Sequence, residues 1–188
     1  EINESVDKNM GYYNLIENLV DQRDYLKDDL GFKEFYKSDE KELLDKEILK
    51  TYKKLLFKQD NLDLKKLMLR YMDYNLDEKV MLLDELIKIS DTKKEEIKYR
   101  DERFSVNREL ENHNNALEDL NYLIAYYKDS ANIASKDLAI LNDYELGYMF
   151  FEKGNIHLAL KDTSKACENW YKAKLYKSFL VDEFLYYY

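Results

Sequence analysis

Histidine and cysteine, the residue types that most often bind metal ions or act as nucleophiles, are scarce in this chain of 188 residues. The two histidines, His113 and His157, are 44 residues apart, and neither has a cysteine or carboxylate at the spacing of a zinc or di-iron site. The single cysteine, Cys167, follows Ala166 in a helical pattern and lacks the cationic neighbour that activates a thiol, so we interpret it as a small packing residue. The sequence therefore predicts no metal ion and no cofactor.

Carboxylates are abundant, but their pattern gives no sign of acid–base catalysis. Pairs such as Asp28-Asp29 and Glu95-Glu96 are typical of solvated helix faces in a chain with 39 acidic and 30 basic residues. A catalytic carboxyl needs an apolar pocket that shifts its pKa, and no sequence pattern marks such a pocket. We therefore expect no catalytic residue and predict that the chain is not an enzyme.

The net charge of −9 restricts the classes of partner. Nucleic acids and anionic membrane surfaces bind cationic protein faces, whereas the lysines here alternate with acidic residues, as in Lys93-Lys94-Glu95-Glu96. The longest apolar stretch, residues 122–127, is far shorter than the ~20 residues of a membrane span. The sequence thus predicts no nucleic acid and no membrane insertion, and leaves a protein or peptide as the expected partner.

Tyrosine is the residue type that most favours a recognition role. The chain contains 18 tyrosines, which combine a large contact area at low entropic cost with a polar end. Such side chains suit a surface that binds another protein. They equally suit packing between neighbouring helices, and the sequence leaves this choice open for each tyrosine.

The elements that must position these side chains are helices. Proline is absent and glycine occurs only 4 times, which argues against β-rich, Rossmann and P-loop folds, since their turns and phosphate loops require these residues. Apolar residues recur at intervals of three and four, as in Leu64, Leu67 and Tyr71. Short polar clusters such as Asn142-Asp143 separate helices of about 13 to 20 residues. The predicted fold class is all-α, built from antiparallel helical hairpins.

The chain contains an internal repeat. Residues 104–123 align without a gap on residues 154–173, which lie 50 positions later. The matched pairs are Leu110 with Leu160, Asn112 with Asp162, Ala116 with Ala166, Leu120 with Trp170 and Leu123 with Ala173. A shift of 34 positions in the other direction places Leu82, Leu86 and Ile89 on Ala116, Leu120 and Leu123. Helix-turn-helix units with such periods stack on one another.

This pattern resembles the tetratricopeptide repeat family, whose period is 34 residues. In the last unit, Gly154 in the first helix, a polar turn and then Ala166, Trp170 and Ala173 look like the small-large-small pattern of the family. The run Ala166-Cys167-Glu168-Asn169-Trp170 is similar to a variant common in bacterial members. Small residues let two helices approach, and a large aromatic ring fills the space against the next hairpin. The residues assigned to repeat packing are Ala116, Leu120, Leu123, Gly154, Ala166, Trp170 and Ala173.

The resemblance implies one helical-repeat domain over residues 1–188, with hairpins stacked as a right-handed superhelical solenoid. It is closest over residues 147–176, less close over 97–128 and least close over 63–90, so the repeats are expected within 63–176.

Three segments depart from a regular array. The extra length between Ala116 and Ala166 predicts an inserted helix near 131–142. Residues 177–188 are expected to form a capping segment, because solenoids need their end faces covered. The helices of residues 1–60 either continue the array or form a simple bundle.

In this family, the first helix of each unit lines a concave groove that binds extended peptides or partner helices. The resemblance therefore implies a binding groove with aromatic, apolar and charged residues. Its expected residues are Leu67, Tyr71, Tyr74, Lys98, Asp101, Arg108, Tyr148, Phe151 and Asn155.

The expected function is that of a non-catalytic protein- or peptide-binding module acting as a scaffold or adaptor. One alternative is a ligand-sensing regulatory domain of a larger protein, and another is a structural oligomer whose aromatic ends stack between chains. The first residue is Glu1 rather than Met, which is compatible with a removed targeting segment or an upstream domain. The compartment stays open, cytoplasmic or exported, as does the oligomeric state.

Overall fold

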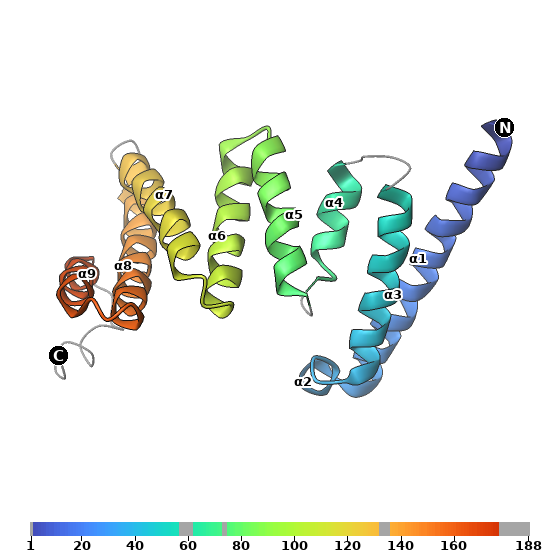
Figure 1. Ribbon diagram of the computed structural model, residues 1–188, viewed down its shortest axis with the longest axis horizontal. Helices are drawn as coiled ribbons and strands as arrows, with labels where there is room; N and C mark the ends of the chain where they lie inside the picture. The colour runs from blue at the N-terminus through green and yellow to red at the C-terminus, as the bar shows by residue number, and fades with distance from the viewer. Residues whose placement is uncertain (1, 57–61, 73–74, 132–135, 177–188) are drawn as a thin grey trace. The chain divides into compact units, whose positions relative to one another are not determined.

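A computed structural model describes residues 2–56, 62–72, 75–131 and 136–176 of the chain. The described residues are almost entirely helical and contain no strand, so the all-α prediction is confirmed for them (Figure 1). The predicted capping segment, residues 177–188, lies outside the described residues.

The chain divides into two compact units, Glu1–Ile89 and Ser90–Tyr188. The sequence favoured one continuous domain, whereas the contacts group around two separate sets of helices. We call these sets unit 1 and unit 2, and each is described by itself.

The described residues of unit 1 form five helices. They are α1 (Ile2–Leu30), α2 (Phe32–Phe35), α3 (Asp39–Leu56), α4 (Leu62–Leu69) and α5 (Leu76–Ile89). Helix α1 packs along α3, α3 packs against α4, and α4 packs against α5. Gly31 ends α1 with a φ of 73°, a conformation that costs glycine little, and its N–H donates to Lys27 O at 3.0 Å.

A buried ion cluster joins several elements of unit 1. The fully buried Asp45 carboxylate on α3 is 2.6 Å from Nε of Arg23 on α1 and 2.8 Å from Nζ of Lys41. The Arg23 guanidinium also lies 5.0 Å from the centroid of the Phe35 ring and 5.3 Å from that of Tyr71. One cation therefore connects α1 to α3, to α2 and to the turn that follows α4.

The described residues of unit 2, within 90–131 and 136–176, form two helical hairpins. Its helices are α6 (Lys93–Glu109), α7 (His113–Ala131), α8 (Lys136–Ala159) and α9 (Thr163–Leu175). Each packs against the next along the chain. A three-residue turn, 110–112 or 160–162, joins the two helices of each hairpin (Figure 1).

The two turns of unit 2 have the same backbone conformation. Glu111 and Lys161, 50 residues apart, both have left-handed φ angles, of 57° and 62°. The following N–H groups, of Asn112 and Asp162, donate to Asn107 O at 2.8 Å and to His157 O at 2.9 Å. This is a Schellman ending, in which the left-handed position is most often glycine. The alignment of the two halves of unit 2 thus corresponds to a structural equivalence.

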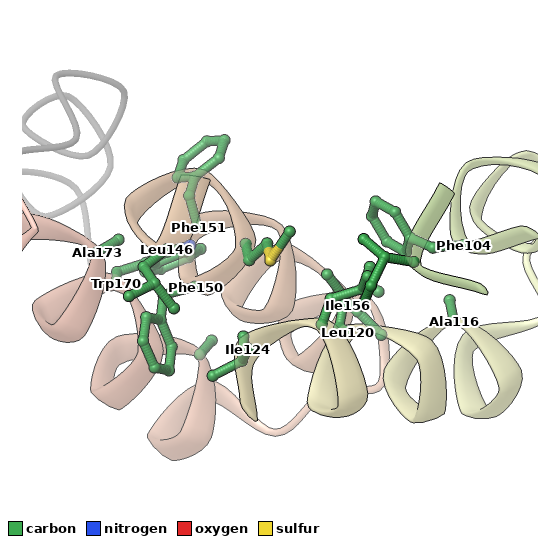
Figure 2. Close-up of a cluster of buried hydrophobic side chains, with 14 residues drawn as sticks. Phe104, Ala116, Leu120, Ile124, Leu146, Phe150, Phe151, Ile156, Trp170 and Ala173 are labelled. Carbon is green, nitrogen blue, oxygen red and sulfur yellow. The ribbon is translucent and has the colours of Figure 1, made fainter. Parts of the chain in front are cut away.

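The residues assigned to repeat packing lie in the core of unit 2. Figure 2 shows the cluster of buried hydrophobic side chains that forms this core. Six of its members have no exposed surface, namely Ala116, Leu120, Leu123, Ala166, Trp170 and Ala173. A Cβ atom on Gly154 would lie 2.4 Å from Cδ1 and from Nε1 of the Trp170 ring, so α8 and α9 approach as closely as they do because residue 154 is glycine.

A polar cluster holds the first hairpin together. The fully buried Asp119 carboxylate on α7 is 2.6 Å from Nη2 of Arg103 and 3.2 Å from Nη1 of Arg100, both on α6. Arg100 also pairs with Glu96 at 2.9 Å and lies 3.9 Å from the centroid of the Tyr122 ring. At the position equivalent to Asp119, the second hairpin has the buried Asn169, whose amide donates to Lys165 O at 2.7 Å.

Two expectations about repeat boundaries differ from the structure. Residues 136–142 are the first part of α8 rather than a separate inserted helix, because α8 continues through Asn142-Asp143 without a break; residues 132–135 lie outside the described residues. In unit 1, Leu82 and Leu86 are buried like the residues they align with, but Ile89 is 42 % exposed whereas Leu123 is fully buried.

Candidate functional site

The groove residues expected on α6 and α8 lie in unit 2, and some of them share contacts. Lys98, Asp101 and Arg108 are exposed on α6, and Tyr148 is half-buried on α8. The Arg108 guanidinium is 2.9 Å from the Glu152 carboxylate of α8 and also donates to the Tyr148 side chain. Arg108 therefore links the first helices of the two hairpins.

The other two expected residues of α8 serve the core. Phe151 is 8 % exposed and belongs to the buried cluster of unit 2. Asn155 accepts a hydrogen bond from Nε1 of Trp170 at 3.2 Å, so its side chain positions the tryptophan.

Charge is unevenly distributed around Asp101. Partial burial raises the pKa of Glu145 on α8, and the Asp101 carboxylate raises it further. Burial is also the largest cause that raises the pKa of Tyr127 on α7 and of Tyr148 on α8; the carboxylates of Glu145 and of Glu152, respectively, come next, and Asp101 adds a smaller effect. The three groups, on α7 and α8, therefore lie within electrostatic reach of Asp101 on α6. Among the described residues, neither Asp101 nor Glu145 is paired with a cation. We call Asp101, Arg108, Glu145, Tyr148 and Glu152 the α6–α8 surface.

Sequence reasoning missed three contributors to this region. Glu145 and Glu152 lie three residues before and four residues after Tyr148, a spacing that places them on the same helix face. That spacing was available in the sequence. Tyr127 gave no such signal, because it belongs to the second helix of a hairpin, which the family pattern does not assign to a groove.

The groove residues expected in unit 1 have different surroundings. Tyr71 is 8 % exposed, stacks on Tyr52 with ring centroids 6.0 Å apart and lies beneath Arg23. Burial raises the pKa of Tyr52 to about 12 and also raises that of Tyr71. Leu67 is half-buried on α4, and Tyr74 lies outside the described residues. Tyr71 thus packs within unit 1.

A shallow hollow of about 360 Å³ lies where the two turns of unit 2 face each other. Residues 111–115 and Leu160 line it. Within the described residues, Nδ1 of His113 is buried without a hydrogen-bond partner.

The described segments contain neither a cluster of metal-binding side chains nor a helix that could span a membrane. Across these segments, no three histidine, cysteine, aspartate or glutamate side chains come together in a way that could hold a metal ion. None of the described helices combines the length and apolar character required to span a bilayer.

The chain was compared with known proteins at the level of sequence family and of structure. No protein-family model, curated protein or solved structure matches it.

Proposed function

We propose that this chain is a non-catalytic helical-repeat module, of tetratricopeptide-like architecture, that binds a peptide or protein segment through the α6–α8 surface. The observation that carries the proposal is the convergence of side chains from α6 and α8, the first helices of two equivalent hairpins. Arg108 and Glu152 satisfy each other at 2.9 Å, whereas Asp101 and Glu145 repel each other and have no cation partner among the described residues.

The equivalence of the two hairpins supports the repeat architecture. The Schellman turns at Glu111 and Lys161 have the same hydrogen bonds, and Trp170 occupies the position of Leu120. Stacked hairpins of this kind expose the first helix of each pair along one side, which suits an extended ligand.

The chemistry of the surface favours a segment that carries a basic side chain. A lysine or arginine between Asp101 and Glu145 would relieve the repulsion between the two carboxylates. Tyr148 offers an aromatic ring and Tyr144, 55 % exposed and one turn earlier on α8, offers a second. Aromatic rings and carboxylates together favour cations and the apolar stems of basic side chains.

The test is selection from a random peptide library on the immobilised chain, followed by calorimetric titration of the enriched peptides. We expect enriched sequences to contain lysine or arginine. The Glu145→Gln/Tyr148→Ala variant should bind them at least about tenfold more weakly, as expected for residues at the centre of an interface.

Tyr171→Ala is the matched control, because Tyr171 is 62 % exposed on α9, outside the α6–α8 surface. It should leave the affinity unchanged. A library that yields no enriched peptide, or peptides that bind the double variant as tightly as the parent, would overturn the proposal.

A further inference from the structure

Three lysines of unit 2 converge on another side of α8. Lys128 on α7 and Lys172 on α9 place Nζ 5.1 Å and 5.9 Å from the centroid of the Phe150 ring. Lys153 lies on α8 within reach of both charges, since each acts on its ionisation. Lys153 is five positions after Tyr148, so the two side chains leave α8 about 140° apart. We call Lys128, Lys153 and Lys172 the lysine cluster.

The lysine cluster has fewer negative partners than positive charges. Lys172 pairs with Glu168 at 2.5 Å. Nζ of Lys153 donates to the neutral Asn121 Oδ1 at 2.6 Å, and Lys128 contacts the ring of Phe150. In the part of the chain that the structure describes, neither Lys128 nor Lys153 pairs with a carboxylate. A local excess of about two positive charges remains, in a chain whose net charge is −9.

This excess is unfavourable in the free chain. Partial burial, followed by the charges of Lys172 and Lys128, lowers the pKa of Lys153, while Glu168 opposes the shift. The positions of Lys128 and Lys172 in the last turns of α7 and α9 offset part of the repulsion, because cations are stabilised at helix C-termini. A bound anion would relieve the remaining repulsion between the lysine side chains.

We infer that Lys128, Lys153 and Lys172 form a binding site for a phosphate group, carried by inorganic phosphate or by a small phosphate ester. Lysine binds phosphate as a point charge with three donors, and a phosphate monoester carries a charge of about −1.5 to −2 at pH 7. Nζ of Lys128 and Nζ of Lys172 both lie within 6 Å of the Phe150 ring centroid, so this positive charge is gathered around one side chain, which favours a small anion over an extended polyanion. The site is separate from the α6–α8 surface and does not rest on the proposed function.

His157 provides an internal reporter, since it follows Lys153 by one turn of α8. Burial, Lys153 and the α9 residue Lys165 lower its pKa, opposed by Asp162 in the turn and Glu168 on α9. A phosphate dianion held by the lysine cluster favours the protonated imidazole, so the pKa of His157 should rise when phosphate binds. His113 serves as the reference, because it lies at the start of α7, far from Lys128 in sequence.

The experiment titrates inorganic phosphate, and separately glycerol phosphate, into the full chain at constant ionic strength set with chloride. Amide and histidine NMR signals are followed. We expect saturable shifts at Asn121 and His157, and an affinity for both anions at least about tenfold weaker in the Lys128→Ala/Lys153→Ala/Lys172→Ala variant. Binding of inorganic phosphate alone would restrict the ligand to the free anion, and would still support the site.

Lys50→Ala/Lys88→Ala/Lys94→Ala removes three exposed lysines elsewhere and is the charge-matched control. It should bind phosphate as the parent does. The inference is overturned by shifts no larger with phosphate than with chloride, by equal affinity of the parent and the cluster variant, or by equal weakening in both triple variants. Lys128→Gln, at an exposed position, provides a single substitution with little risk to folding and should also weaken binding.

Discussion

Gly154 illustrates how one missing side-chain atom sets the distance between two helices. A Cβ at this position would overlap the Trp170 ring and approach Ala166 O at 3.1 Å. The ring cannot move aside easily, because it is fully buried and donates to Asn155. The close packing of α8 on α9 therefore depends on this residue.

We predict that Gly154→Ala lowers the free energy of unfolding by about 1 to 3 kcal/mol, since overpacking outweighs the ~1 kcal/mol by which alanine favours a helix. Gly11→Ala is the control, because a Cβ on Gly11 of α1 meets nothing within 4 Å and should not destabilise the chain. Urea denaturation followed by circular dichroism measures both. Equal effects of the two substitutions would contradict the packing argument.

The burial of single residues could be predicted from the sequence where small and large apolar residues recur at helical spacing. Ala166, Trp170 and Ala173 were identified in this way, because intervals of four and three on a helix mark one face. Tyr71 could not be placed, since a tyrosine in a helical pattern looks the same whether it faces solvent or an arginine. Its burial depends on Arg23 and Tyr52, which come from other helices.

At the scale of elements, the Glu96 carboxylate in the α6–α7 hairpin makes the stability of the chain depend on pH. Although burial acts to raise it, the pKa of Glu96 falls from 4.5 to about 2 through hydrogen bonds from Tyr122, Arg100 and Lys93. The pKa of Glu96 is lower in the folded chain than in the unfolded chain. Its ionised carboxylate therefore stabilises the fold at pH values above the unfolded-state pKa, and this contribution is lost as the pH falls through the folded-state pKa.

We predict that the stability of the chain decreases between about pH 4.5 and pH 2, and that Glu96→Gln reduces the part of this decrease due to Glu96. Thermal unfolding at a series of pH values measures the effect. The exposed Glu118→Gln removes the same charge from α7 and should leave the acid dependence as in the parent. An unchanged slope in Glu96→Gln would show that the hairpin does not use this carboxylate.

The type of element could be predicted more reliably than its ends. The polar pair Asn142-Asp143 indicated a break, because these side chains compete for backbone hydrogen bonds. The structure instead continues α8 through this pair, since a propensity of a few tenths of a kcal/mol per residue is readily outweighed by packing elsewhere on the helix. Adding these residues to α8 accounts for part of the wider spacing between the hairpins.

At the scale of the whole molecule, unit 2 has a core of its own. Its buried cluster runs from Ile97 to Ala173, and every member lies within residues 90–188. A set of helices with its own core is able to fold independently.

We predict that a fragment of residues 90–188 folds by itself. Circular dichroism should show a helical spectrum and one cooperative thermal transition. The full chain under the same conditions is the reference. A fragment that loses helicity gradually on heating would show that unit 2 needs unit 1.

The division into units could not be predicted from the sequence. The cluster Ser90-Asp91-Thr92 resembles the other polar breaks, because a helix cap has the same composition whether or not a unit boundary follows it. Unit 2 was recognisable through its repeat. Unit 1 gave no comparable signal, since its helices are joined by the Arg23–Asp45 ion pair rather than by a repeated pattern of small residues.

Trp170 has a spectroscopic consequence, because it is the single tryptophan of the chain. Its indole is enclosed between α8 and α9 without exposed surface. Intrinsic fluorescence excited at the indole band therefore reports on this one hairpin, while the 18 tyrosines report on the whole chain. The emission maximum should shift to longer wavelength only when the last hairpin opens, which gives unit 2 an optical signal that unit 1 does not share.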